Sequence, residues 1–340
     1  MKNMIKNIFT YFCLCSSWAS FAQGNFPDNS IKLIVPFAAG GGVDNAARLI
    51  AREMQTNLHV SVVVENRPGA NGTIGAKAVQ LAPADGFTLL FSASTHVLTK
   101  YVMANAPYDP LTDFSFIARV GSAPLLMVIS PDLPQTKLKE VIESAKAHPD
   151  KWSAGLPALG AASHLATLML AKQGNLNLTT AVYKGTAPAL ADVAGGHTQI
   201  LIDSIISLQS LAKSGKVKPI IVTSAKRSSV MPNVPTALES GYPSFVTESW
   251  YGIWAPKGTP EDRVQTLNKA ANDAVRQLSK TGAFEQLGIE PVIESVAEFK
   301  KYTATYSQEN ADLLKSSRPK GRGFLLLDAH VRAREYFLPH

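Results

Sequence analysis

Cysteine is almost absent from this sequence. The 340 residues include two cysteines, Cys13 and Cys15, and both lie within the first 22 residues. A basic start, a short apolar stretch and small residues at its end make this segment typical of a secretory signal peptide, which we expect to be cleaved near Ala22. The exported chain then has no cysteine, which excludes disulfides, thiol catalysis and cysteine metal sites.

The chain also lacks a strong charge of one sign and a long apolar run. Its net charge of +7 comes mostly from its two ends, since residues 1–22 carry two lysines and no acid and residues 318–340 carry five basic residues and two acids. Between these ends, 26 basic side chains stand against 24 acidic ones, so we expect no nucleic-acid partner. No segment after the signal peptide approaches about 18 consecutive apolar residues, so no transmembrane helix is predicted.

Motifs for catalysis are missing as well. The glycines at 40–42 are followed by Asn45 where a dinucleotide fingerprint requires another glycine, and no P-loop lysine follows them. Ser163 lacks the flanking glycines of a nucleophile elbow, and His164 beside it would point about 100° away on a helix, which disfavours an ester hydrolase. The histidines are scattered, which disfavours a metal site. We therefore expect a protein that is not an enzyme, with no cofactor and no metal.

The sequence does contain alternating strand and helix patterns. Short apolar strands are predicted at 31–35, 60–64 and 88–91, and apolar residues at helical spacing between 43 and 54 predict a helix after the first strand. Further strands are predicted at residues 125–129, 181–183, 200–202 and 219–222. This order predicts an α/β fold with an open, largely parallel sheet.

Two hydroxyl residues mark the predicted starts of C-terminal helices. Thr259 precedes Pro260 and is followed three residues later by Asp262, and Ser295 is followed three residues later by Glu298. A hydroxyl with an acid three residues on is the pattern of a capping box. We therefore expect Thr259 and Ser295 to cap their helices.

Four small loops, rich in glycine and hydroxyl residues, adjoin the predicted strands and helices. They cover residues 38–44, 92–96, 160–164 and 183–188. Open α/β sheets bind ligands at the carboxyl ends of their strands, and such loops hold anions with backbone N–H groups and hydroxyls. Together the four loops favour a cleft for an anion or a polar small molecule.

Several single residues allow two interpretations each. His96 and His164 would either orient a ligand or form structural hydrogen bonds. Asp203, at the end of a predicted strand, would either meet a ligand ammonium group or hold a loop in place. Trp250 and Tyr251 would either line a cleft or pack in the core.

Eight short motifs occur in a fixed order along the chain. They are VPFAAGGGVD at 35–44, VENRPGA at 64–70, PADGFTL at 83–89, YDPLTDF at 108–114, SHL at 163–165, YKG at 183–185, VPT at 234–236 and APKGTP at 255–260. In this combination, residues 26–317 resemble the substrate-binding receptors of tripartite tricarboxylate transporters, the Bug (Bordetella uptake gene) family.

The resemblance implies a fold like that of type II periplasmic binding proteins, a Venus flytrap of two α/β lobes joined by crossover strands. Lobe 1 would comprise residues 23–122 and 248–317, and lobe 2 would comprise residues 123–247. The lobes would close around a small carboxylate, which would be an organic acid, an acidic amino acid or an aromatic carboxylate. The ligand-binding residues carried over from the family are Phe37, Ala39, Gly41, Ser94, Thr95, Ser163, Lys184, Gly185, Thr186 and Asp203.

The resemblance also implies a cellular compartment and a protein partner. We expect a monomer in the periplasm that delivers its ligand to the membrane subunits of a secondary transporter. A periplasmic sensor that signals to a membrane kinase is the alternative, because both roles use the closed, liganded form.

Two departures from the family pattern stand out. Thr186 and Ala187 follow Gly185 where the family usually has further glycine, so we expect a narrower pocket with an added hydrogen-bond donor. The pattern stops after Ser317, and residues 318–340 form an atypical tail of the kind that a frameshift near the end of a reading frame would produce.

Overall fold

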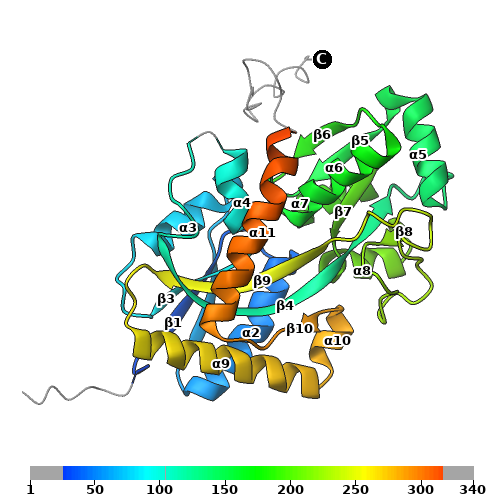
Figure 1. Ribbon diagram of the computed structural model, residues 1–340. Coiled ribbons are helices and arrows are strands. Elements are labelled where there is room, and N and C mark those ends of the chain that lie inside the picture. Colours follow the sequence, from blue (N-terminus) through cyan, green and yellow to red (C-terminus); the bar gives the residue numbers. More distant parts are fainter. Residues whose placement is uncertain (1–25, 104, 317–340) are drawn as a thin grey trace, which may run out of the picture.

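The computed structural model describes residues 26–103 and 105–316 (Figure 1). The predicted signal peptide, with Cys13 and Cys15, and the atypical tail at 318–340 lie outside the described residues. The strands are β1 (Ile31–Val35), β2 (Val62–Asn66), β3 (Thr88–Ala93), β4 (Phe114–Ile129), β5 (Ser153–Leu156), β6 (Thr179–Val182), β7 (Ile200–Ser204), β8 (Lys218–Val222), β9 (Glu248–Pro256) and β10 (Glu290–Pro291).

Helices connect most of these strands, as the alternating pattern predicts. They are α2 (Gly42–Leu58), α3 (Thr73–Gln80), α4 (Thr95–Val102), α5 (Leu138–Ala147), α6 (Ala162–Gly174), α7 (Thr186–Ala194), α8 (Ile205–Lys213), α9 (Glu261–Lys280), α10 (Ala283–Leu287) and α11 (Val296–Ser316), with short 3₁₀ turns η1 (Ala70–Gly72) and η2 (Pro149–Lys151). The predicted helix at 43–54 is therefore confirmed as part of α2, whereas the strand predicted at 60–64 begins two residues later than expected, at Val62.

The strands form a sheet with the order β2-β1-β3-β9-β4-β7-β5-β6, and β8 and β10 also pair with β4. The α/β class is confirmed. The expectation of a largely parallel sheet is wrong, because β9 runs antiparallel to β3 and β4, and β4 runs antiparallel to β7, β8 and β10. Among the named strands of the described residues, parallel pairing is confined to the β2-β1-β3 and β6-β5-β7 groups.

Strand β4 connects these two parallel groups. It spans 16 residues, far more than the predicted strand at 125–129. Its part from Phe114 to Pro124 pairs with β9, and its part from Leu125 to Ile129 pairs with β7 and β8. In Figure 1, β4 and β9 run side by side through the middle of the molecule. The predicted lobe boundaries at 122/123 and 247/248 remain a prediction, and they fall near this change of partners.

Helix α11 crosses the same region on the outside of the sheet. It packs on α4, β4 and α6 (Figure 1). At its C-terminal end, Leu314 clusters with Leu98 of α4 and Leu165 of α6, and all three side chains are buried. Helix α11 therefore contacts elements on both sides of the crossing strands. Within the described residues, no helix is both long enough and apolar enough to cross a membrane.

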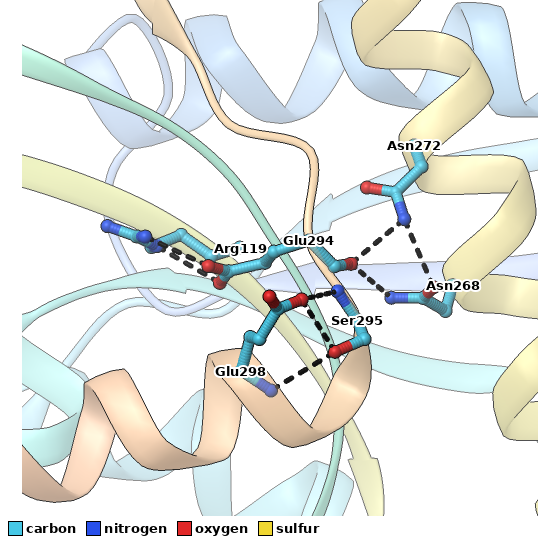
Figure 2. A network of polar contacts seen from close by, with 6 residues as sticks. All are labelled: Arg119, Asn268, Asn272, Glu294, Ser295 and Glu298. Carbon is cyan, nitrogen blue, oxygen red and sulfur yellow. Dashed lines mark hydrogen bonds and ion pairs between the residues drawn. The ribbon is translucent and has the colours of Figure 1, made fainter.

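A polar network fixes the start of α11 (Figure 2). Arg119 of β4 donates two hydrogen bonds to the Glu294 carboxylate, from Nε to Oε1 at 3.1 Å and from Nη2 to Oε2 at 2.9 Å. The backbone carbonyl of Glu294 accepts hydrogen bonds from the side-chain amides of Asn268 and Asn272 on α9, at 3.2 and 3.0 Å. One residue thus connects β4, α9 and the entry to α11.

The two predicted capping boxes have different outcomes. At Ser295 the box is confirmed, because the Glu298 carboxylate accepts from the Ser295 N–H at 2.8 Å and the Glu298 N–H donates to the Ser295 hydroxyl at 3.3 Å (Figure 2). The prediction of a capping box at Thr259 is wrong. The Thr259 hydroxyl is buried and donates to the Pro256 carbonyl at 2.8 Å, so Pro260 takes the N-cap position of α9.

Candidate functional site

A cleft of about 490 Å³, a volume that includes its opening to solvent, lies where the loops at the ends of several strands meet. Its lining comes from the β1–α2, β3–α4, β5–α6, β6–α7 and β7–α8 connections, with Ser249 and Tyr251 of β9. Each of the four loops predicted from the sequence contributes lining residues. The structure therefore brings them together at one place, as the rule for open α/β sheets predicts.

Five helices begin at this cleft, namely α2, α4, α6, α7 and α8. Their N-cap residues are Gly41, Ser94, Ala161, Gly185 and Ser204, and none of these side chains makes a capping hydrogen bond. The first turn of a helix has N–H groups with no partner inside the helix, and the helix dipole places partial positive charge there. Five such ends around one cleft form an environment that favours an anion.

Charged side chains contribute little to this cleft. Among the described residues that line it, none is lysine, arginine or histidine, and Asp203 is the single acidic one. Burial raises the pKa of the Asp203 carboxyl group to about 6, although hydrogen bonds from the Thr186 hydroxyl and the Ser204 N–H oppose this rise. The Thr186 hydroxyl donates to Asp203 Oδ2, so this pair connects the start of α7 to the end of β7. Asp203 thus does hold a neighbouring element in place, and it also lines the cleft.

Residues 46–318 of the chain match the sequence model of a protein family described as "Tripartite tricarboxylate transporter family receptor". A receptor for a carboxylate is consistent with the cleft described above. The chain belongs to this receptor family. The resemblance read from the sequence motifs is therefore confirmed, and so is the expectation of a binding protein, because the family consists of receptors and not of enzymes.

Relatives and solved structures agree with the family match. The receptor is 33% identical to Protein BugT of Bordetella pertussis over 322 residues, which cover 94% of this chain and 99% of that protein. The structure of the periplasmic binding protein BugD superposes with a TM-score of 0.81 at 36% identity, covering 86% of this chain and 98% of that one.

Two further solved structures contain ligands. MatC of Rhodopseudomonas palustris, with bound malate, matches with a TM-score of 0.80 at 30% identity over 85% of this chain and 100% of that one. Rpa4515 of R. palustris, with adipate, matches with a TM-score of 0.81 at 31% identity over 86% of this chain and 98% of that one. These matches confirm that the receptor has the fold of periplasmic binding proteins.

The structure divides the predicted ligand-binding residues of the receptor into two groups. Those that line the cleft are Phe37, Gly41, Thr95, Gly185, Thr186 and Asp203. Those that do not line it are Ala39, Ser94, Ser163 and Lys184. Of the second group, Ala39 and Lys184 are exposed, whereas Ser94 and Ser163 are fully buried. Direct ligand contacts of all ten residues remain predictions.

Other residues line the cleft without a sequence signal that singles them out. Ser207 of α8 is one of them. It also explains why position 42 is glycine, because a Cβ on Gly42 would lie 2.8 Å from the Ser207 Oγ. Pro157 and Ala158 also line the cleft, and they escape prediction from the sequence because the predicted loop begins only at residue 160. Helix α8 approaches α2 from a distant part of the sequence, so no local pattern could have indicated this contact.

The two histidines in the loops have structural roles. The His96 ring lies 4.7 to 5.3 Å from the rings of Phe114, Trp254 and Tyr108, and burial lowers its pKa to about 3. His164 Nδ1 accepts a hydrogen bond from the Gly160 N–H at 3.0 Å, and burial lowers its pKa to about 4. Both rings are therefore neutral at physiological pH, and neither supplies a positive charge to an anion.

Both members of the aromatic pair from β9 are buried in the core, and one of them also lines the cleft. Trp250 is fully buried, with its ring 6.0 Å from that of Phe299 on α11, so its interpretation as a core residue is confirmed. Tyr251 points to the other face, where it lines the cleft and its hydroxyl donates to the Ser204 Oγ at 2.7 Å. Adjacent strand residues face opposite sides of a sheet, so one of the two had to face away from the cleft.

Proposed function

We propose that the receptor captures a small carboxylate in this cleft and delivers it to the membrane subunits of a tripartite tricarboxylate-type transporter. The observation that carries the proposal is the convergence of five uncapped helix N-termini on a cleft whose described lining has no cationic side chain. Backbone N–H groups then supply the hydrogen bonds that a carboxylate needs. Malate and adipate in the structures of MatC and Rpa4515 support this ligand class.

The size and polarity of the cleft fit such a ligand. The volume of about 490 Å³ includes the opening to solvent and is an upper limit on the size of the ligand, which excludes a folded protein. Hydroxyl groups of Thr95, Ser207 and Ser249 line it beside the helix ends and are able to orient the polar groups of the ligand. The ring of Phe37 and the alanines at the start of α6 provide apolar surface for its carbon chain.

Export and hinge closure complete the proposal. The signal peptide at residues 1–22 would direct the receptor to the periplasm, where we expect it to act as a monomer. The change of strand partners along β4, together with β9, provides two crossing strands about which the proposed lobes, 23–122 with 248–317 and 123–247, would close. Closure would remove the ligand from water and form the surface that the membrane subunits recognise.

A substitution that fills the cleft without straining the backbone tests this proposal. Gly41 has φ −78°, and a Cβ there would meet no atom closer than 3.7 Å, so the backbone tolerates a side chain that projects towards Thr186. We expect Gly41→Leu to abolish binding of every acid that the wild type binds among malate, citrate, aspartate and benzoate, measured by isothermal titration calorimetry.

The matched control is Ala147→Leu, which adds the same side chain at an exposed position at the end of α5. It should bind as the wild type does. A wild-type protein that binds none of these acids, or a Gly41→Leu variant that binds them normally, would contradict the proposal.

A further inference from the structure

Asn71 makes a two-way hydrogen-bond pair with a residue 88 positions away in the sequence. Its side-chain amide Nδ2 donates to the Leu159 carbonyl at 2.8 Å, and its Oδ1 accepts from the Leu159 N–H at 2.7 Å. Asn71 belongs to η1, which follows β2, whereas Leu159 lies in the β5–α6 connection. The pair therefore joins the β2-β1-β3 group of strands to the β6-β5-β7 group.

The backbone around Asn71 has an unusual conformation. Asn71 has φ 58° and Ala70 has φ 44°, and they lie between Gly69 at φ 125° and Gly72 at φ 84°. Four consecutive residues thus have positive φ, a region that is costly for alanine and better tolerated by asparagine and glycine. Such a backbone persists when its surroundings hold it, and strain of this kind is concentrated at functional positions. The result here is that the Asn71 amide is presented to Leu159.

Leu159 lies in the chain between residues that line the cleft. Pro157 and Ala158 before it and Ala161 and Ala162 after it all line the cleft, and Ala162 is the first residue of α6. The Asn71 amide therefore fixes the backbone segment that carries one of the five helix N-termini. Because Asn71 lies in η1, the pair holds this segment against the part of the receptor that contains the β2-β1-β3 group of strands.

The neighbouring residue, Gly160, shows how closely the two parts approach. A Cβ on Gly160, which has φ 74°, would lie 3.3 Å from both Leu98 Cβ and Val102 Cγ2 of α4. Opening of the cleft would have to separate these surfaces and break both hydrogen bonds of Asn71. The pair thus contributes to the closed arrangement and would be absent from an open one.

We propose that Asn71 is a positioning residue that stabilises the closed form of the receptor and lengthens the lifetime of the bound ligand. The inference rests on the proposed function in that it concerns ligand release, but the Asn71–Leu159 pair itself requires no ligand. Two neutral hydrogen bonds that water replaces on opening correspond to about a ten-fold effect on the ratio of closed to open receptor. The effect falls on dissociation, because the pair forms only after the two parts come together.

Asn71→Gly is the informative substitution. Glycine accepts φ 58° without strain and removes both hydrogen bonds, and Asn71→Asp is a second variant that keeps the shape but replaces the Nδ2 donor with an oxygen. Asn175→Gly is the matched control, because Asn175 also has positive φ, at 49°, but caps the C-terminus of α6 and is exposed.

Two readouts test the proposal. Because residues 23–340 contain no cysteine, spin labels on Leu81→Cys and Val182→Cys, at exposed positions in the two parts, report their separation by electron–electron dipolar spectroscopy. In ligand-free protein, we expect Asn71→Gly and Asn71→Asp to reduce the ratio of the short-distance to the long-distance population about ten-fold relative to wild type, with no change in Asn175→Gly. For whichever of malate, citrate, aspartate or benzoate the wild type binds, stopped-flow measurement should show dissociation about ten-fold faster with association unchanged.

The outcomes separate this inference from the proposed function. Distance distributions and dissociation rates that match those of Asn175→Gly would overturn the role of Asn71. A shifted distance distribution in a protein that binds none of the four acids would support the role of Asn71 in closure and contradict the proposed function.

Discussion

Asp203 places a carboxyl group in a cleft that otherwise favours an anion. The Thr186 hydroxyl and the Ser204 N–H donate to this carboxyl group, but burial dominates and raises its pKa from 3.8 to about 6. The sequence identifies Thr186 as a departure from the family pattern, and the structure shows that its hydroxyl is used by Asp203. A ligand carboxylate beside Asp203 would meet repulsion from the ionised form and none from the neutral form.

This conflict predicts a pH dependence of binding. A carboxylate ligand favours neutral Asp203, so binding takes up a proton and the affinity falls as the pH rises through about 6. Between pH 5 and 7 we expect the wild-type affinity for malate, or for another bound acid of the panel, to fall by about ten-fold. Asp203→Asn should show a flat profile over this range in calorimetric titrations. An affinity that rises with pH in the wild type would instead indicate a cationic group of the ligand at Asp203.

The residues of the site differ in how far the sequence predicts them. Gly41, Gly185 and Asp203 lie where strands end or helices begin, so the rule that ligands bind at the carboxyl edge of a sheet indicates their segments, and the family resemblance names the residues. Ser207 lies inside the first turn of α8 and reaches the cleft because α8 packs against α2. That contact is a property of tertiary packing, and no spacing in the sequence carries it.

At the scale of elements, Glu294 connects β4, α9 and α11, which no local sequence pattern predicts. Its carboxylate pairs with Arg119, whose guanidinium also lies 3.5 Å from the centre of the Tyr302 ring on α11. The side chains of Arg119 and Glu294 are 14% and 10% exposed, so water screens their interaction little. Breaking such a pair leaves a nearly buried charge without its partner.

Removal of the Glu294 carboxylate should therefore destabilise the fold. We expect Glu294→Ala to lower the free energy of unfolding by about 3 kcal/mol in urea titrations, because Arg119 then loses its buried partner. The matched control is Glu65→Ala, which removes an ion pair with Arg67 whose side chains are 41% and 43% exposed. That change should cost less than about 1 kcal/mol. Equal costs for the two variants would contradict the account of this network.

Elements with local patterns are the ones that the sequence predicts. Strand β1 and helix α2 follow from apolar spacing and from the glycines between them, and Ser295 caps α11 as expected. Strand β4 escapes prediction over most of its length because Gly121 and Pro124 interrupt its pattern. Its antiparallel pairing with β9, more than 100 residues away in the sequence, depends on the return of the chain and leaves no local signal.

At the scale of the molecule, the parts belong to one arrangement. Two groups of parallel strands direct the starts of five helices to one cleft, and β4 and β9 connect the groups behind it. The motifs that carry the family resemblance are spread over residues 35–260, and most of them lie in the loops or turns of this scaffold. The identity of the bound acid depends on a few hydroxyls and on Asp203, and the sequence alone leaves several acids open.

Native mass spectrometry of the receptor purified from the periplasm tests the central claim most directly. The account predicts one small acid bound per monomer, released on denaturation and absent from the Gly41→Leu variant. It also predicts a polypeptide mass that lacks the first 22 residues. A wild-type receptor that carries no small acid, and takes up none when malate, citrate, aspartate or benzoate is added, would contradict the account.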